Sequence, residues 1–353
     1  MTAMFKTIRD FNVADKRALV RCDFNVPLDD KGNILDDFRI KETIPTIEYL
    51  IQNKARVILM SHLGRPKGKT VEELRLTPVQ DRLMEYLDLS VTKAPDCIGK
   101  KIEEWTHQMQ EGEVLLLENL RFHKEEEEND ENFAKELSKL GDLYINDAFG
   151  ASHRAHASIV GTPKLLPAAA GFLLEKEIKV LTGLRDNPPK PLIAIIGGAK
   201  VEKKVKLINK LSEMADFVLT GGLIQKEAKE KNIQFTHPEK IVEPVDEAAR
   251  GRDIGPKTIE LFKGKIALAK TIFWNGPLGE IEKEEFARGT KAIAEAIVGS
   301  SAFSIVGGGE TVECINQLGL GEGFGHLSTG GGAMLEFLSG EVLPGLQALN
   351  NRS

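Results

Sequence analysis

The stretch RVILMSHLGRPKGK, residues 56–69, decides the kind of fold to expect. A short hydrophobic run that looks buried ends at Met60, and a histidine, an arginine and two lysines follow it. In open α/β sheets, ligands collect at the carboxyl ends of the strands. We therefore expect RVILM to be a strand of such a sheet and the basic residues after it to bind an anion.

Short β-branched runs alternate with amphipathic helical patterns along most of the chain, which predicts βαβ units and parallel sheets. One helical pattern is VEKKVKLINKL, residues 201–211, whose hydrophobic residues recur at helical spacing. Strands are predicted at residues 17–22, 56–60, 113–119 and 142–147, and in a second set at 191–196, 216–220, 271–275 and 302–306. Residues 172–191, between the two sets, read as a helix that ends in two prolines, which favours a domain junction.

Length and composition indicate an ordinary soluble protein. A chain of 353 residues exceeds what one hydrophobic core usually organises, so two domains are expected. The net charge of −6 argues against general binding to nucleic acid or anionic membranes, because both need a basic surface. No secretory signal is expected at the amino terminus, and the apolar stretch LPAAAGFLL (166–174) is too short to span a bilayer.

Three cysteines, Cys22, Cys97 and Cys314, lie far apart in the sequence. Their odd number and wide spacing fit neither a disulfide framework nor a set of zinc ligands. A reducing, cytoplasmic environment is the simple interpretation.

Arginine recurs near the end of every strand in the first set. The residues at these strand ends are Asp23, Asn25, Arg39, His62, Arg65, Arg121, His153, Arg154 and His156. One arginine on a loop is most simply a surface residue, but four at one edge repel one another unless an anion joins them. Guanidinium groups bind carboxylate and phosphate bidentately, so the expected ligand is a small phosphorylated acid. Asp23 and Asn25 are suited to orienting a hydroxyl group.

Two other charged stretches of the first half receive simpler interpretations. The two histidines of HRAH (153–156) have no cysteine or carboxylate nearby at ligand spacing, which disfavours a metal site. The acidic run EEEEND (125–130) is interpreted as the solvated start of a helix, without a functional role.

Glycine takes the place of arginine at the strand ends of the second half, in GGAK (197–200), GGGET (307–311) and GGGA (330–333). Glycine lets backbone N–H groups approach phosphate oxygens, and a helix amino terminus adds a favourable dipole. Lys200 and Lys204 are expected on one side of the helix after GGAK, in a first turn whose dipole disfavours cations. A bound phosphate would reverse that interaction; exposed lysines on a solvated face are the alternative.

Familiar nucleotide-binding signatures do not match. GRPKGKT (64–70) is one residue short between its glycines for a P-loop, and GLGEGFG (319–325) has the wrong spacing for a dinucleotide fingerprint. The catalytic and metal-binding motifs of protein kinases are absent as well. Any nucleotide must therefore bind in a different kind of cradle.

Ten stretches in succession closely resemble the phosphoglycerate kinase family, over about residues 16–346. They are VRCDFNVPL, DDFRI, LMSHLGRPKG, LLLENLRF, INDAFGASHRAHAS, IIGGAKV, DIGPKT, FWNGPLG, IVGGGET and HLSTGGGAMLEFLSG. Any one stretch could occur by chance, whereas ten in order are very specific.

The resemblance implies an α/β fold of two domains, each a doubly wound, mostly parallel sheet flanked by helices. It implies a triose-binding domain at residues 1–171, a hinge helix at 172–187, a nucleotide-binding domain at 188–335 and a segment at 336–353 that packs back on the first domain. The implied reaction is the reversible, magnesium-dependent transfer of a phosphoryl group between 1,3-bisphosphoglycerate and ADP, which gives 3-phosphoglycerate and ATP in glycolysis and gluconeogenesis. Hinge closure, a monomer and a cytoplasmic location are further expectations.

The resemblance also assigns roles to individual residues. Those that would bind the triose are Asp23, Asn25, Arg39, His62, Arg65, Arg121 and Arg154. Those that would bind ADP or ATP are Gly198, Ala199, Lys200, Lys204, Gly221, Gly255, Asn275, Pro277, Glu282, Gly307, Gly308, Gly309, Glu310 and Thr311. The catalytic set would be Arg39, Lys200, Lys204, Gly308 and Gly331, and Glu310 would reach Mg²⁺ through the nucleotide.

The sequence departs from the family pattern in the nucleotide half. Glu310 stands where the family usually has aspartate, and the chain is much shorter than usual between Gly222 and Asp253. The leading hypothesis is an active kinase. The alternatives are a non-catalytic, triose-binding relative with a degenerate nucleotide lobe, and a kinase that acts on another small carboxylate.

Overall fold

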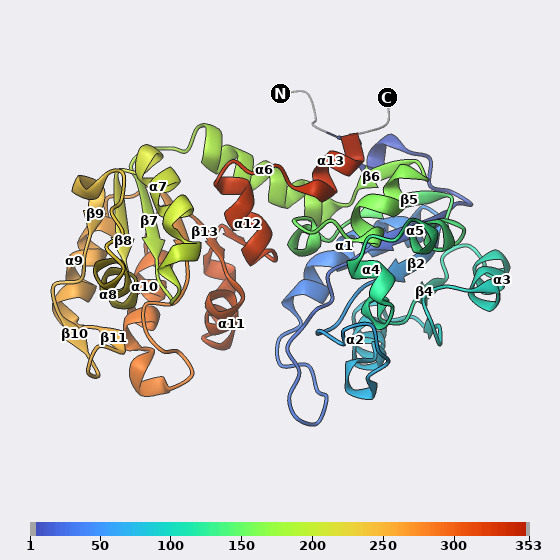
Figure 1. Ribbon diagram of the computed structural model, residues 1–353, viewed down its shortest axis with the longest axis horizontal. Coiled ribbons are helices and arrows are strands. Elements are labelled where there is room, and N and C mark those ends of the chain that lie inside the picture. Colours follow the sequence, from blue (N-terminus) through green and yellow to red (C-terminus); the bar gives the residue numbers. More distant parts are fainter. Residues whose placement is uncertain (1–4, 351–353) are drawn as a thin grey trace. The chain divides into compact units, whose positions relative to one another are not determined.

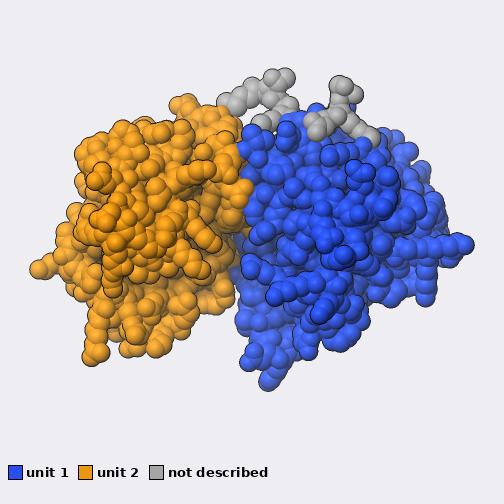
Figure 2. All heavy atoms as spheres, viewed as in Figure 1, with its two compact units in different colours: residues 1–178, 342–353 blue, residues 179–341 orange. Residues whose placement is uncertain are grey.

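The computed structural model describes residues 5–350, and these form two compact units (Figure 2). The first unit contains residues 5–178 and 342–350, and the second contains residues 179–341. Helix α6 (Phe172–Asp186) runs across the boundary at residue 178. Each unit is described by itself below.

The first unit is built on a six-stranded parallel sheet of order β3-β4-β2-β1-β5-β6 within the described residues. Figure 1 labels β2, β4, β5 and β6 of this sheet. Its strands are β1 (Arg17–Arg21), β2 (Arg56–Met60), β3 (Val91–Lys93), β4 (Val114–Leu116), β5 (Leu143–Asn146) and β6 (Ala168–Ala170). Its helices are α1 (Phe38–Gln52), α2 (Thr77–Leu87), α3 (Lys100–Gln108), α4 (Lys124–Glu127), α5 (Glu131–Ser138) and α13 (Pro344–Asn350).

The second unit has a six-stranded parallel sheet of order β14-β13-β12-β7-β8-β9 within residues 179–341. Its strands are β7 (Leu192–Ile196), β8 (Phe217–Thr220), β9 (Ile241–Val242), β12 (Thr271–Asn275), β13 (Phe303–Gly307) and β14 (His326–Leu327), and a small antiparallel pair joins β10 (Glu247–Ala248) to β11 (Asp253–Ile254). Its helices are α7 (Val205–Met214), α8 (Gly222–Glu230), α9 (Pro256–Ile266), α10 (Arg288–Val298), α11 (Gly309–Gln317) and α12 (Gly331–Leu338).

The central strands form because both of their faces are buried. Every residue of β7 and β12 is buried, as a continuous apolar run in a parallel sheet requires. The helices cover these faces with apolar stripes: α5, for example, buries Phe133, Ala134 and Leu137. Its start is fixed by Asp130, whose carboxylate accepts a hydrogen bond from the backbone N–H of Phe133 at 2.8 Å.

The register of the strands brings their carboxyl ends together. Arg21 at the end of β1 pairs with Met60 of β2 and Asn146 of β5. Asn275 at the end of β12 pairs with Ile196 of β7 and Gly307 of β13. In each unit the chain leaves its first strand in one direction and later returns to the other side, so these strand ends are the switch point of the topology, where ligands of such sheets usually bind.

The predicted fold class is therefore confirmed: two doubly wound, parallel α/β sheets flanked by helices. All eight predicted strands are present with small shifts at their ends. The prediction missed β3, β6, β9 and β14, together with the β10–β11 pair. Across residues 5–350, no helix combines the length and the apolar character that crossing a membrane requires.

Candidate functional site

The loop after β1 anchors the first arginine of the predicted triose site. Arg39, at the start of α1, donates from Nη1 to the Asp23 carboxylate at 3.0 Å and to the backbone carbonyl of Asn25 at 3.2 Å. The side-chain oxygen of Asn25 accepts from the backbone N–H of Gly64 at 2.8 Å. Asp23 and Asn25 therefore join the loop after β1 to the loop after β2.

A fully buried arginine that the sequence analysis did not single out lies beneath this loop. Arg21 ends β1, its Nη2 lies 3.2 Å from Nδ1 of His62, and its Nε donates to the Ser158 hydroxyl at 2.8 Å. His62 is buried, with Nδ1 4.0 Å from the Asp23 carboxylate. The strand end therefore fixes the orientation of His62.

Arg121 enters the same region from the short 3₁₀ helix Leu120–Phe122. Its Nη1 donates to the backbone carbonyl of Gly64 at 2.8 Å, and Asn119 accepts from its backbone N–H at 3.1 Å. Its buried Nε lies 3.3 Å from the Glu127 carboxylate without forming a hydrogen bond. Arg121 is thus held in place, while its Nε remains without a hydrogen-bond acceptor.

The electrostatics show an excess of positive charge among these groups. Burial is the main reason why the pKa of His62 lies well below its usual range, and the positive charges of Arg21, Arg121 and Arg39 lower it further. The pKa of His156 is lowered to about 3, mainly by burial and further by the positive charges of Arg121, Arg21 and Arg154. Burial also lowers the pKa of Arg121, and Glu127 offsets this only in part. Neutral histidines among several guanidinium groups, whose charge is only partly offset by carboxylates, are typical of a candidate anion site.

The remaining predicted triose residues are less constrained. Arg65 and Arg154 are exposed, and within residues 5–350 their side chains form no hydrogen bond or ion pair. His153 is partly buried, and its buried Nδ1 has no hydrogen-bond partner in the described chain. The structure therefore interconnects Asp23, Asn25, Arg39, His62 and Arg121, and leaves Arg65 and Arg154 available to a ligand.

The interpretation of the acidic run as a solvated helix start is wrong for Glu126, which is fully buried in α4. Its carboxylate accepts from the Ser158 hydroxyl at 2.5 Å and from the Ser158 backbone N–H at 2.9 Å. It also lies 3.8 Å from Arg21 and 3.8 Å from Nδ1 of His156. Nothing in a run of four glutamates distinguishes Glu126 from its neighbours. Only the fold shows that its carboxylate is buried and offsets part of the positive charge of the arginines.

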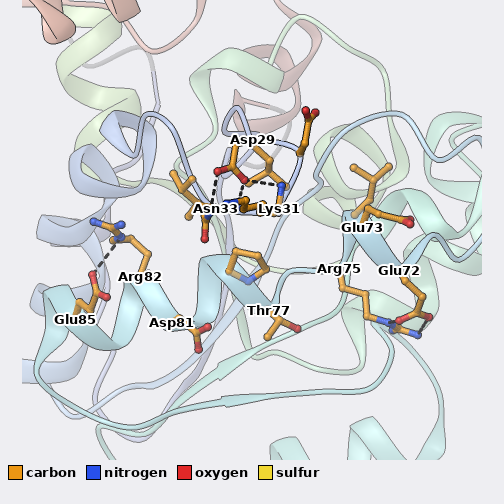
Figure 3. Close-up of a pocket in the computed structure, with 16 residues that line it drawn as sticks. Asp29, Lys31, Asn33, Glu72, Glu73, Arg75, Thr77, Asp81, Arg82 and Glu85 are labelled. Atoms are coloured by element: carbon orange, nitrogen blue, oxygen red, sulfur yellow. Dashed lines mark hydrogen bonds and ion pairs between the residues drawn. The ribbon is translucent and has the colours of Figure 1, made fainter.

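Arg21, Arg39 and Arg121, together with the neighbouring His62, His156 and Glu126, are called the arginine cluster below. A pocket elsewhere in the first unit is separate from this cluster (Figure 3). It lies between the loop around Asp29 and the start of α2, and none of the residues predicted to bind substrate lines it. Its charges are largely satisfied locally, because Arg75 pairs with Glu72 at 2.6 Å and Asp29 accepts from Asn33 and Lys31. The arginine cluster is therefore the better candidate for an anion site.

The second unit presents backbone rather than side chains at its strand ends. The Asn275 amide donates to the Gly307 carbonyl at 2.9 Å, which joins the ends of β12 and β13. A Cβ on Gly331 would lie 3.2 Å from Cα of Gly308, so the amino termini of α11 and α12 meet closely. A Cβ on Gly197 would lie 2.0 Å from the Pro277 carbonyl oxygen, which excludes any larger residue there.

The expectation that Lys200 and Lys204 share a face of one helix is wrong. Lys200 precedes the helical segment with φ of +64°, a short 3₁₀ helix follows at Val201–Lys203, and α7 begins only at Val205. Lys204 occupies the junction, and its ammonium group contacts the Gly197 carbonyl. Burial lowers its pKa to about 8 despite the nearby carboxylates of Glu310 and Glu227.

Glu227 of α8 is a second carboxylate that the sequence analysis missed. It accepts from the backbone N–H groups of Lys200 at 3.3 Å and Val201 at 2.7 Å. These two backbone donors, at the start of the helical segment after GGAK, are therefore occupied within the chain. The backbone around Gly308 and Gly331 is a better candidate for binding phosphate, because its N–H groups are less occupied by hydrogen bonds within the described chain.

The other predicted nucleotide residues lie at strand ends or in loops. Gly198 and Ala199 follow β7, Gly221 follows β8, Pro277 follows β12, Gly309, Glu310 and Thr311 open α11, and Glu282 is exposed in the loop before α10. Gly255 caps α9, where the Asp246 carboxylate already accepts from Lys257 and Thr258. The nucleotide roles of all these residues stay predictions.

Glu310 fits a magnesium ion carried by phosphates. It lies in the first turn of α11, is exposed, and its carboxylate has no hydrogen bond or ion pair among residues 5–350. Mg²⁺ typically binds through one or two carboxylates together with substrate phosphates and water. A free carboxylate beside a glycine-rich strand end meets that need.

The fold and its strand ends define a class of protein: two doubly wound α/β units, one with arginine-rich strand ends and one with glycine-rich strand ends. A family model described as phosphoglycerate kinase matches residues 8–233 and 225–341. The chain therefore belongs to the phosphoglycerate kinase family.

Individual relatives and solved structures agree. Phosphoglycerate kinases of Chlorobium phaeobacteroides (strain BS1) and Dictyoglomus turgidum are 44% and 46% identical; the alignments cover 98% of this chain in both cases, and 99% and 98% of the relatives. The crystal structure of the phosphoglycerate kinase from Pyrococcus horikoshii OT3 is 35% identical, with a TM-score of 0.87 and 98% of each chain covered. That of Coxiella burnetii is 34% identical, with a TM-score of 0.80 and 99% of each chain covered. These names give no support to the non-catalytic alternative.

The comparisons also bear on the nucleotide half. The alignment with the Chlorobium protein extends over 394 positions although this chain has 353 residues, so the relative contains segments that are absent here. The two pieces of the family match meet at residues 225–233, which lie inside the segment predicted to be shortened.

Proposed function

We propose that the chain is an active phosphoglycerate kinase that transfers a phosphoryl group reversibly between 1,3-bisphosphoglycerate and ADP. The observation that carries the proposal is the arginine cluster of the first unit, where two histidines have pKa values lowered by burial and by the surrounding guanidinium groups. Such a cluster suits a small ligand that bears both carboxylate and phosphate groups. Family membership supports the same substrate.

The residues of the first unit would bind and orient the triose. Arg39 is fixed by Asp23, and Arg121 by Asn119 and the Gly64 carbonyl, so both guanidinium groups are ready before the ligand binds. His62, neutral at pH 7, can donate or accept one hydrogen bond without adding charge. Because these two guanidinium groups need little further ordering, most of their electrostatic attraction contributes to binding.

The second unit would hold ADP or ATP. Backbone N–H groups near Gly308 and Gly331 would approach the phosphates, and the Lys204 ammonium would neutralise the transferred phosphoryl group. Mg²⁺, held by Glu310 and the nucleotide, would supply further charge neutralisation at the phosphates. The attacking phosphate oxygen is already anionic and the leaving group is a stable carboxylate, so no general base is required.

The proposal includes domain closure, because in-line transfer requires the two substrates to meet and water to be excluded. Residues 172–187 would act as the hinge helix of a cytoplasmic monomer. Small-angle scattering with both substrates bound would test closure, and light scattering would test the monomer.

A coupled assay tests the activity itself. We expect Mg²⁺-dependent formation of ATP from 1,3-bisphosphoglycerate and ADP, and an Arg39→Ala variant with turnover reduced at least tenfold but with a normal unfolding midpoint. Arg56→Ala, at a partly buried arginine outside the predicted set, provides the control. Absence of ATP formation by the intact chain would overturn the proposal, and undiminished turnover with a substrate lacking the 3-phosphate would show that another carboxylate is the natural acceptor.

A further inference from the structure

Three metal-ligating side chains from two separate loops converge in the first unit, outside the arginine cluster. Asp96 and Cys97 follow β3, and His123 follows the 3₁₀ helix Leu120–Phe122. One donor atom of each residue lies within 4.8 Å of the other two, and Nε2 of His123 is 2.7 Å from a carboxylate oxygen of Asp96. This juxtaposition was invisible in the sequence, where Cys97 and His123 lie on different predicted loops.

The donor types select a particular class of ion. A thiolate, an imidazole and a carboxylate together suit zinc and similar first-row ions, whereas magnesium and calcium prefer oxygen ligands alone. A tetrahedral ion would hold the nitrogen and the oxygen about 3.3 Å apart, so the His123–Asp96 pair would open by roughly 0.6 Å. The Asp96 side chain is 49% exposed and has room to make that movement.

The burial of the three groups suits a site with one open position. The thiol of Cys97 is buried, while the side chains of Asp96 and His123 are partly exposed, so an ion would enter from the solvent side. The loop is held below by a hydrogen bond from the backbone N–H of Ala94 to the Leu116 carbonyl at 2.8 Å. Three protein ligands with water as the fourth form the usual arrangement of an open zinc site.

A plainer account is that the Asp96–His123 hydrogen bond simply ties two loops together. The carboxylate also accepts from the backbone N–H of Cys97 at 2.7 Å, so Asp96 is well satisfied without an ion. That account needs no thiol beside the pair, and it predicts no binding of a thiophilic metal. The two accounts therefore differ in a measurable way.

We propose that Asp96, Cys97 and His123 form a binding site for a divalent ion of the zinc class. Binding forms bonds from the ion to the Cys97 sulfur, to Nε2 of His123 and to an Asp96 oxygen. The Cys97 thiol releases its proton to solvent, and the proton that Nε2 of His123 shares with Asp96 moves to Nδ1 or to solvent, so that Nε2 can bind the ion. The bound ion fixes the chain between Arg121 and Glu126, because His123 lies between them in the sequence. The site is therefore positioned to stiffen the segment that carries two residues of the arginine cluster.

Cobalt provides a direct optical test on the full chain, after metal removal with a chelator and without nucleotide. We expect Co²⁺ to bind with one equivalent, to produce thiolate-to-cobalt absorption, and to be displaced by Zn²⁺ but not by Mg²⁺. Cys97→Ser removes the absorption, whereas Cys314→Ser, which changes a cysteine outside the cluster, retains it. Asp96→Asn and His123→Gln weaken Co²⁺ binding at least tenfold.

The outcomes separate the two accounts. No thiolate absorption with the intact chain, or absorption that persists in Cys97→Ser, overturns the proposal. If Cys97→Ser fails to fold by circular dichroism, Asp96→Asn decides, and cobalt affinity unchanged in that variant also overturns it. The readout involves neither substrate nor turnover, so its failure is independent of the proposed kinase activity.

Discussion

The strand ends of the two units are electropositive for different reasons: the first carries arginine side chains, and the second offers backbone N–H groups and a lysine. In the first unit, Arg21, Arg39 and Arg121 are fixed by side-chain hydrogen bonds, and a buried carboxylate, Glu126, offsets part of their charge. In the second unit, the strands lead into glycine-rich backbone, and Lys204 is a partly buried cation. Side-chain charge needs an internal counter-charge before the ligand arrives, whereas backbone dipoles need only close access.

The largest effect on turnover is expected for Lys204→Ala, which removes the partly buried ammonium group of the second unit. Turnover should fall about 10²–10³-fold, as for other single charge-stabilising donors. Because burial disfavours this ammonium group in the folded protein, the unfolding midpoint should stay the same or rise. Steady-state kinetics and thermal unfolding measure the two effects.

Lys203→Ala is the matched control, since Lys203 is exposed and its side chain forms no hydrogen bond or ion pair in the described structure. Equal losses of turnover in the two variants would mean that Lys204 has no special place in the second unit.

The next effect is expected in the first unit for Glu126→Gln. Arg21 and Glu126 have side chains only 1% and 0% exposed, so neutralising the carboxylate leaves a buried positive charge. Removing one partner of a buried ion pair costs about 3–5 kcal/mol of unfolding free energy. Denaturant unfolding measures it, with the exposed Glu128→Gln expected to change stability by less than about 0.5 kcal/mol. A loss below 1 kcal/mol for Glu126→Gln would show that the arginines need no internal counter-charge.

A smaller effect is expected for Gly308→Ala, which tests the backbone site. Gly308 has φ of +104°, and a Cβ there would lie 3.0 Å from the Asn275 amide nitrogen. The strain should cost about 1–3 kcal/mol of stability, and affinity for Mg·ADP should fall roughly tenfold because the backbone donors move. Isothermal calorimetry measures the affinity.

Gly319→Ala is the control for backbone strain alone, because Gly319 has φ of +67° and open space around it. It should lose stability but bind Mg·ADP normally. Normal binding by Gly308→Ala as well would remove this turn from the nucleotide site.

The smallest effect concerns the protonation of Lys204. With its pKa near 8, the free protein carries a partly deprotonated amine at pH 8–8.5. A bound phosphate favours the charged form and raises the pKa, so nucleotide binding should take up a fraction of a proton there and none at pH 6. Calorimetry in buffers of different ionisation enthalpy measures this uptake, which should vanish in Lys204→Ala. Proton release at pH 8.5 would contradict the assignment.

Most of the fold could be predicted because central strands are continuous apolar runs. The predicted strands at 191–196 and 271–275 correspond to β7 and β12, which are buried throughout. The missed strands β3, β6, β9 and β14 are the outermost strands of the two sheets. Edge strands are short and only partly covered, so their sequences carry little periodic signal.

The predicted site was recoverable where a residue's type reveals its role. Arg39 and Arg121 stand out because guanidinium groups are unusual at successive strand ends. Glu126 and Glu227 do not stand out, because a glutamate in a charged helix reads as solvated until the fold buries it or aims it at backbone donors. The same holds for the candidate metal site, because the fold must bring two loops together before Asp96, Cys97 and His123 form a cluster.

The sequence by itself determined the alternation of strands and helices, the family resemblance and the residue types at the strand ends, because these depend on local pattern and side-chain chemistry. Tertiary structure alone decided which charges are buried, which are paired and which backbone donors remain available. Those properties depend on contacts between segments far apart in the chain, such as Arg21 with Ser158 and Lys200 with Glu227. No local pattern encodes such a contact, because its free energy arises only when folding brings the two distant partners together.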